Sequence, residues 1–335
     1  MRALLVSRHA PIRERPLDLV EMADPEPGPA EIVVRVSACA ICRTDLHVIE
    51  GDLPPQRIPI VPGHQIVGRV EGAGPQCRRF RPGDRVGIAW LRWTCGRCTY
   101  CLSGAENLCD GSRYTGYHEH GGYAEKAVVA EDYAYALPAA FSDLEAAPLL
   151  CAGIIGFRAL KRSAIQDGGR LAIYGFGSSA HVVIQIARHR GCEVLVATRG
   201  AKHRELALHL GASWAGDTFD PLPAAPDGAI VFAPAGEIVP AALRAVRKGG
   251  TVALAGIHMS PIPEMEYRDC LFHEKNLVSV EANTRLDGEA LLREAAEIRI
   301  RPRVTPFALD EANEALNRLA SDGIDGTGVL VIPPS

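Results

Sequence analysis

Short apolar strands alternate with helices along the second half of the chain, and this alternation constrains the fold more than any other feature of the sequence. Strands are expected at 171–174, 193–198, 228–232 and 251–255, and helices at 179–189, 202–210 and 239–246. Strands that are joined through single helices form parallel sheets with helices on both faces. The second half is therefore predicted to be a doubly wound α/β domain.

The first half of the chain has a different pattern, and 335 residues are enough for a second hydrophobic core. Over residues 32–136, short β-like runs are separated by glycine and proline, which indicates a small β-barrel or sandwich with long loops. Ser142 and Glu145 have the spacing of a helix-capping box, so a domain boundary is expected close by. Near the C-terminus, a helix is predicted at 309–321, and an apolar strand at 329–332 must join a sheet.

Composition and charge argue against several classes of protein. The net charge is only -4, and the sequence lacks the basic stripe that binds nucleic-acid phosphates. No apolar run is long enough to span a bilayer, and the apolar start at 1–6 is too short for a signal peptide, so a cytoplasmic protein without a membrane partner is expected. Ten cysteines in that compartment favour metal binding or catalysis over a disulfide framework.

Four of the cysteines, Cys95, Cys98, Cys101 and Cys109, lie close together in the sequence. At these separations one loop can offer four sulfurs tetrahedrally to a Zn²⁺ ion, and a site filled by four cysteines has no position left for water or substrate. A structural zinc site is therefore predicted. The alternative is that the four thiols are buried or paired in disulfides.

A catalytic zinc site needs three protein ligands and one open position. Cys42, His64 and Cys151 are the remaining candidates, but they are too far apart in the sequence for their spacing to associate them. A histidine that follows glycine, as His64 does, is more often an ordinary loop residue. The sequence pattern alone therefore does not establish whether these three residues form a second metal site.

Five segments, in order along the chain, resemble a known family. They are Cys42-Arg43-Thr44-Asp45-Leu46-His47, Pro62-Gly63-His64, Gly83-Asp84-Arg85-Val86, the four-cysteine loop and the glycine-rich turn at Gly175. Over essentially the whole chain the sequence resembles the zinc-dependent medium-chain alcohol dehydrogenases, and within them the bacterial alcohol-preferring and cinnamyl-alcohol-dehydrogenase-like branches. The resemblance implies a GroES-like catalytic domain over 1–145, completed by 286–335, and a Rossmann cofactor domain over 146–285.

The resemblance also implies the ligands of a catalytic zinc ion. Cys42, His64 and Cys151 would hold it, and Asp45 would hydrogen-bond the ligand histidine. Two zinc ions per chain are then expected. Members of the family usually have glutamate directly after this histidine, whereas this chain has Gln65. The zinc environment is expected to be more positive as a result, and ligand exchange through this position weaker.

A proton path is implied in the same way. Thr44 would accept the proton of the substrate alcohol, and His47 would pass it through the cofactor ribose to solvent. The alternative for Thr44 is an ordinary helix-capping threonine.

A dinucleotide fingerprint follows the first strand of the α/β domain. It reads Gly175-Phe176-Gly177-Ser178-Ser179-Ala180, with alanine in the third glycine position. Gly175 and Gly177 permit a tight turn and the close approach of a pyrophosphate to the helix N-terminus. Because the motif joins a predicted strand to a predicted helix, it is interpreted as a cofactor site that includes Ala180.

The end of the next strand bears on the choice between NAD and NADP. Thr198-Arg199-Gly200-Ala201-Lys202 lacks the carboxylate that normally binds the ribose hydroxyls of NAD. Thr198, Arg199 and Lys202 are therefore candidate cofactor residues, and NADP is favoured over NAD because both cations can pair with a phosphate. The alternative is that the two cations are only solvated charges at a helix start.

Further expectations rest on the resemblance. Arg43 would contact the cofactor pyrophosphate and Arg285 would return to the cofactor cleft, although a surface salt bridge is a fair alternative for Arg285. Trp93 would either shape the substrate pocket or pack in the core. Relatives pair through the edge of the cofactor-domain sheet, here around Leu254 and Val278, so a homodimer or homotetramer is expected.

The expected substrates are small molecules, namely primary aliphatic or aromatic alcohols and their aldehydes. Among enzymes, the alternative is a zinc-containing polyol or secondary-alcohol dehydrogenase. Outside enzymes, it is a dinucleotide-binding sensor or scaffold whose zinc is purely structural, which predicts one zinc ion per chain and no turnover.

Overall fold

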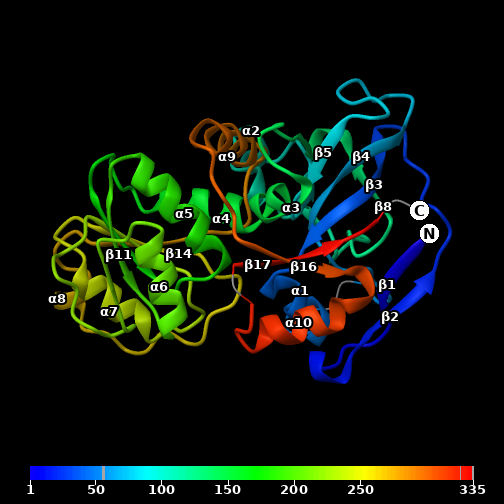
Figure 1. Cartoon of the computed structure of the whole chain (residues 1–335). Helices are drawn as coiled ribbons and strands as arrows, with labels where there is room; N and C mark the ends of the chain where they lie inside the picture. Colours follow the sequence, from blue (N-terminus) through cyan, green and yellow to red (C-terminus); the bar gives the residue numbers. More distant parts are fainter. Residues whose placement is uncertain (55–56, 325, 334–335) are drawn as a thin grey trace. The chain divides into compact units, whose positions relative to one another are not determined.

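The computed structural model describes residues 1–54, 57–324 and 326–333, and the chain divides into two compact units. Unit 1 contains Met1–Cys151, Ala282–Ala296 and Arg301–Ser335, and unit 2 contains Ala152–Glu281 and Glu297–Ile300. The colours of Figure 1 follow the chain out of unit 1 into unit 2 and back again. Unit 1 is thus assembled from segments that are distant in the sequence.

Unit 2 is built on a parallel sheet with the strand order β12-β11-β10-β13-β14-β15. Its strands are β10 (Arg170–Tyr174), β11 (Glu193–Ala197), β12 (Trp214–Gly216), β13 (Gly228–Val231), β14 (Thr251–Leu254) and β15 (Asn276–Ser279). The strand that comes first in the chain lies inside the sheet, which grows outward from it in both directions, as in a Rossmann fold. The predicted doubly wound fold is confirmed.

Helices connect the strands of unit 2. They are α4 (Ala152–Arg162), α5 (Ser178–His189), α6 (Ala201–His209), α7 (Ile238–Ala245) and α8 (Tyr267–Cys270). Helix α4 packs against α5, and the two lie side by side in Figure 1. All four residues of β13 are buried, as expected for a strand that is covered on both faces.

Unit 1 contains most of the remaining strands in one sheet, in the order β16-β17-β3-β4-β5-β9, with β8 also paired to β3. These strands are β3 (Glu31–Ala40), β4 (Gln65–Ala73), β5 (Arg85–Ile88), β8 (Lys126–Ala130), β9 (Ala134–Ala136), β16 (Val304–Ala308) and β17 (Thr327–Val331). Two small pairs are formed by β1 (Arg2–Val6) with β2 (Leu17–Glu21) and by β6 (Leu91–Trp93) with β7 (Arg113–Tyr114).

The long strand β3 changes partner along one edge. It pairs with β8 over 31–35 and with β17 over 38–40, while β4 follows its other edge with register shifts at both places. Such irregularities bend a strand, which lets one strand serve two neighbours in turn. The apolar strand predicted at 329–332 corresponds to β17, which pairs with β3 in antiparallel and with β16 in parallel.

The helices of unit 1 are short, apart from one. They are α1 (Arg43–Glu50), α2 (Thr99–Leu102), α3 (Asp143–Ala146), α9 (Arg285–Ile298) and α10 (Ala312–Ala320). The predicted capping box is present at α3, where Ser142 Oγ accepts the N–H of Glu145 at 3.3 Å. Helix α10 packs against α1 and also lies next to β16 and β17 (Figure 1).

Candidate active site

Cys42 lies at the N-terminus of α1 and caps that helix. Its sulfur accepts the N–H of Thr44 at 3.3 Å, and the carboxylate of Asp45 accepts the N–H of Cys42 at 2.9 Å. The positive end of a helix dipole favours a negatively charged sulfur. The thiol of Cys151 donates to the same sulfur and lowers the pKa of Cys42 well below its ordinary value. Cys42 is therefore prepared to act as a thiolate.

His64 is presented by the turn that precedes β4. Gly63 has a φ of +95°, and a Cβ there would lie 2.3 Å from the ring of Tyr123, so glycine is required. Nδ1 of His64 lies 2.9 Å from Oδ1 of Asp45. Nε2 of His64 is buried and, among the described residues, has no hydrogen-bond partner. When a carboxylate accepts a hydrogen bond from one ring nitrogen of a histidine, the other nitrogen is available to bind a metal ion.

The structure brings together the three residues that the sequence pattern could not associate. One ligand atom from each of Cys42, His64 and Cys151 lies within 4.8 Å of the other two. Two sulfurs and one imidazole nitrogen form a ligand set used by catalytic zinc sites with an open fourth position. A metal ion would also satisfy the unpaired nitrogen of His64. These residues therefore fit a Zn²⁺ ion.

Thr44 and His47 lie three residues apart in α1, a spacing that places side chains on the same face of a helix. Thr44 is buried, whereas the side chain of His47 is 19% exposed. Nδ1 of His47 lies 2.8 Å from Oδ2 of Asp52, just beyond the left-handed Gly51 that ends the helix. The sequence analysis missed Asp52, although a glycine followed by a carboxylate after His47 was a usable signal.

An aromatic cluster packs against His64. The ring of Trp90 lies 5.0 Å from that of His64 at an interplanar angle of 75°, and Tyr114 and Tyr117 stack on Trp90 at 4.9 and 5.8 Å. Of the described tryptophans, Trp90 is thus the one beside His64, whereas Trp93 is 42% exposed. The exposure of Trp93 contradicts the core-packing alternative, and its role in shaping the substrate pocket stays a prediction.

Gln65, where relatives have glutamate, is fully buried. Its amide nitrogen donates to the carbonyl of Ala40 at 3.3 Å. Part of the side chain's hydrogen-bonding capacity is thus used within the sheet. The expected effect on zinc exchange stays a prediction.

The four-cysteine loop forms a second cluster. One sulfur from each of Cys95, Cys98, Cys101 and Cys109 lies within 4.8 Å of the others. The N–H groups of Arg97 and Cys98 bond the sulfur of Cys95 and lower its pKa to about 6. All ten cysteines are free thiols, so the disulfide alternative is wrong. The four sulfurs fit a structural zinc ion.

Two arginines that the resemblance assigns to the cofactor form ion pairs within unit 1. Arg43 bonds Asp322 at 2.5 Å. Arg285 makes a two-pronged contact with Glu106, at 3.0 Å through Nε and 2.8 Å through a terminal nitrogen, and lies over the ring of Tyr133. The pair with Glu106 corresponds to the salt-bridge alternative for Arg285.

The glycine-rich turn of unit 2 lies between β10 and α5. Gly175 has a φ of +85°, and a Cβ there would lie 2.9 Å from the backbone nitrogen of Ala233, which follows β13. The turn thus lies where the strand order reverses, the usual site of dinucleotides in such sheets. Gly177 precedes α5 with open space where a Cβ would be, and Ala180 is fully buried. The turn fits a pyrophosphate.

The residues after β11 are the candidates for contact with the cofactor ribose. Thr198 is buried, and Arg199 and Lys202 are exposed. Within the described ranges neither cation has a hydrogen bond or ion pair. His203, which the sequence analysis missed, bonds the carbonyl of Phe176 and so ties α6 to the glycine-rich turn.

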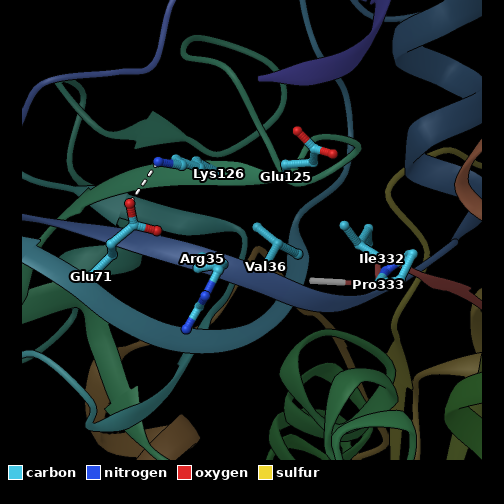
Figure 2. Close-up of a pocket in the computed structure, with 7 residues that line it drawn as sticks. All are labelled: Arg35, Val36, Glu71, Glu125, Lys126, Ile332 and Pro333. Carbon is cyan, nitrogen blue, oxygen red and sulfur yellow. Dashed lines mark hydrogen bonds and ion pairs between the residues drawn. The ribbon is translucent and has the colours of Figure 1, made fainter. Parts of the chain in front are cut away.

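A separate hollow of about 160 Å³ lies at the fork where β8 and β17 leave β3 (Figure 2). Three of its four charged residues, Glu71, Glu125 and Lys126, form ion pairs within the fold. Lys126 Nζ lies 2.6 Å from Glu71 and 2.7 Å from Asp24, and Arg2 lies 2.8 Å from Glu125. The hollow therefore lacks the metal-binding side chains found at Cys42, His64 and Cys151 and in the four-cysteine loop.

Comparisons with known proteins agree with this arrangement. Residues 28–139 match the family model of the alcohol dehydrogenase GroES-like domain, and residues 180–297 match that of the zinc-binding dehydrogenase. The probable alcohol dehydrogenase AdhA of Mycobacterium tuberculosis (strain CDC 1551 / Oshkosh) is 48% identical, over 99% of this chain and 97% of its own. The chain belongs to the zinc-dependent alcohol dehydrogenase family.

Other alcohol dehydrogenases extend the comparison. The NADP-dependent alcohol dehydrogenase C 1 of Mycolicibacterium smegmatis (strain ATCC 700084 / mc(2)155) is 30% identical over 88% of each chain. A cinnamyl alcohol dehydrogenase of Sorghum bicolor superposes with a TM-score of 0.90 at 27% identity, over 98% of this chain and 97% of the other.

The predicted family, fold and enzyme class are thereby confirmed. The protein is an NAD(P)-linked, zinc-dependent alcohol dehydrogenase with a GroES-like and a Rossmann-type domain. In the described part of the chain, no helix combines the length and apolar character needed to cross a bilayer.

Proposed function

We propose that the enzyme interconverts primary alcohols and aldehydes with NADP at a zinc ion held by Cys42, His64 and Cys151. The observation that carries this proposal is the group formed by the sulfurs of Cys42 and Cys151 and the buried Nε2 of His64, which has no hydrogen-bond partner among the described residues. Unit 1 would serve as the catalytic domain and unit 2 as the cofactor domain. The ten free thiols favour a reducing compartment such as the cytoplasm.

Zinc, when bound there, supplies a Lewis acid that polarises the substrate oxygen. The protein's own contribution is to hold the ligands in one arrangement. Asp45 orients His64 through Nδ1, and α1 presents the sulfur of Cys42 at its N-terminus. Trp90 packs against His64 and limits the access of water and bulky groups to this side of the site.

A proton must leave the substrate alcohol during oxidation and return during aldehyde reduction. Thr44 is the hydroxyl nearest to Cys42 in the helix and would exchange this proton with the substrate. His47, one turn further along and partly exposed, would exchange it with solvent. Asp52 bonds Nδ1 of His47 and would hold the ring in a single orientation.

The proposed preference for NADP rests on charge. The end of β11 carries no carboxylate, and Arg199 and Lys202 are exposed, with no partner in the described part of the chain. Two such cations would pair with the 2′-phosphate of NADP. A relative with 30% identity is named as NADP-dependent, which supports this preference, and NAD remains the second possibility.

The proposed substrates are primary aliphatic or aromatic alcohols and their aldehydes. The stacked rings of Trp90, Tyr114 and Tyr117 form a flat, rigid wall beside His64, which favours unbranched or planar groups over branched ones. A polyol or secondary-alcohol dehydrogenase is the competing assignment.

Two zinc ions per chain and a homo-oligomer complete the proposal. The four-cysteine loop would hold the second, structural ion. The edge strand β15 and the exposed rings of Tyr267 and Phe272 in the same unit would take part in pairing with another subunit.

The test follows absorbance of the nicotinamide with benzaldehyde and a panel of short aldehydes and ketones, using NADPH and NADH in parallel. Oxidation of NADPH that stops after zinc chelation is expected. A preference for NADH would overturn only the cofactor assignment, and a preference for ketones only the substrate class. No turnover, with one zinc ion per chain, would favour the sensor or scaffold.

A further inference from the structure

A tyrosine that is distant in the sequence lies directly behind the proposed catalytic zinc site. Tyr123 is fully buried, and its hydroxyl lies 3.0 Å from Oδ2 of Asp45. We propose that Tyr123 is a positioning residue whose hydroxyl fixes the carboxylate of Asp45 and thereby holds His64 as a metal ligand. This inference rests on the proposed function, because it requires a metal ion at His64.

The hydrogen bonds of Asp45 show why one hydroxyl matters. Oδ1 contacts Nδ1 of His64 at 2.9 Å, and Oδ2 accepts from the N–H of Cys42 at 2.9 Å and from Tyr123. Asp45 is only 1% exposed, so water cannot easily replace a missing donor. Hydrogen bonds to a carboxylate are stronger than those between neutral groups, and here three of them set its orientation.

The phenol of Tyr123 is suited to a permanent donor role. Burial, followed by the nearby charge of Asp45, raises the pKa of Tyr123 well above its ordinary value. The proton therefore stays on the phenol oxygen, and the carboxylate of Asp45 keeps this donor across the working pH range. Tyr123 does not itself exchange protons with the substrate.

The ring of Tyr123 has a separate role. It packs beneath Gly63, and the N–H of Tyr123 donates to the carbonyl of Pro62 at 3.0 Å. The same side chain thus shapes the turn that carries His64 and bonds the carboxylate that orients it. Substitution by phenylalanine separates the two roles, because it keeps the ring and removes only the hydroxyl.

Unit 1 offers a matched control. Tyr135 is also buried, at 3% exposure, and its hydroxyl accepts from the side-chain amide of Asn283 at 3.3 Å. Tyr135→Phe removes a buried hydroxyl of the same kind without touching Asp45 or His64. A general loss of stability would affect both variants alike.

The experiment measures metal retention by the zinc-loaded protein, together with the visible spectrum after cobalt substitution. Tyr123→Phe is expected to release one of two zinc ions at about tenfold lower chelator concentration, since partners behind a ligand tune metal affinity. The cobalt bands of that site should shift. Tyr135→Phe should match the parent in both measurements.

A double-mutant cycle tests the route through the carboxylate. In an Asp45→Asn background, Tyr123→Phe should weaken zinc binding much less than it does alone, whereas additive losses would show that Tyr123 does not act through Asp45. A fluorinated tyrosine at position 123 keeps the ring and strengthens the donor, which covers the case in which Tyr123→Phe does not fold. Unchanged cobalt bands in the folded variant would overturn the inference.

The outcome is separable from that of the proposed function. A parent protein that binds one zinc ion and has no turnover contradicts the proposed function itself. A parent with two zinc ions and normal turnover, combined with unaltered zinc retention in Tyr123→Phe, contradicts only the role of Tyr123. Equal zinc loss in both tyrosine variants would also contradict it.

Discussion

Cys42 combines two duties in one side chain, because its sulfur both caps α1 and belongs to the proposed metal site. Substitution can separate them. Cys42→Ser keeps an oxygen that caps helices well but is a poor zinc ligand, whereas Cys42→Ala loses both functions. Both variants should lose turnover. The free energy of unfolding of Cys42→Ala should be lower than that of Cys42→Ser by about 1 kcal/mol, because only serine keeps the helix cap.

Steady-state kinetics and denaturant unfolding check this prediction. The far-UV circular dichroism of both variants should match that of the parent, which establishes that the fold is kept. Retained activity in a folded Cys42→Ala protein would show that the metal assignment is wrong.

The contact between His47 and Asp52 makes a second residue-scale prediction. Asp52→Asn keeps the size of the side chain but weakens its hold on Nδ1 of His47. We expect kcat to fall by about tenfold with little change in cofactor affinity, because proton transfer by a positioned group contributes roughly 10²–10⁴ to a rate. Loss of cofactor binding without loss of kcat would argue against the proton path.

Sequence reasoning reached the candidate site only in part. The four-cysteine loop could be predicted from spacing, because its ligands are close in the chain. Cys42, His64 and Cys151 could be associated only through a family resemblance, since no local pattern joins them. Tyr123 and Trp90 could not be found at all, because their contacts depend on how distant loops pack.

At the scale of elements, the turn after β11 is where the proposed preference for NADP can be tested. Arg199→Ala should weaken NADPH binding far more than NADH binding, because only NADPH carries the phosphate that the arginine would pair with. Loss of one such contact is expected to cost about 1.5–3 kcal/mol, or roughly ten- to a hundredfold in affinity.

Titration of nicotinamide fluorescence with each cofactor provides the measurement. Arg204→Ala is a suitable control, because Arg204 lies in α6, just after Arg199, but bonds Asp217 and the carbonyl of Thr198. Equal losses for NADPH and NADH in Arg199→Ala would mean that Arg199 does not read the phosphate.

The elements themselves were predicted unevenly. The strands and helices that the sequence analysis placed in unit 2 are found within one residue of the predicted ends, because apolar runs and glycine turns mark them. β12 was missed, since its three residues pair only with β11 and have no apolar alternation. Helix α4, which starts at Ala152, was also missed.

At the scale of the whole molecule, the two proposed zinc ions should be lost with different consequences. Removal of the ion at Cys42 should stop turnover and leave the fold intact. Cys98→Ala should instead loosen the four-cysteine loop, and with it the contact of Glu106 with Arg285, so unfolding should begin at lower temperature.

Metal analysis, activity and thermal unfolding, recorded during stepwise chelation, separate the two losses. Inactivation is expected before any fall in the unfolding temperature, because a site with an open position gives up its metal more readily than one enclosed by four sulfurs. A Cys98→Ala protein with normal stability and two zinc ions would contradict the structural role of the loop.

The pairing of β17 with β3 has a consequence for synthesis on the ribosome. β3 is made early and β17 much later, after all the strands of unit 2. Unit 2 is nearly continuous in the chain and can fold as soon as it emerges, since domains fold as units during translation. The half that is translated first is therefore the half that is completed last, with residues 38–40 of β3 unpaired on one edge until β17 is made.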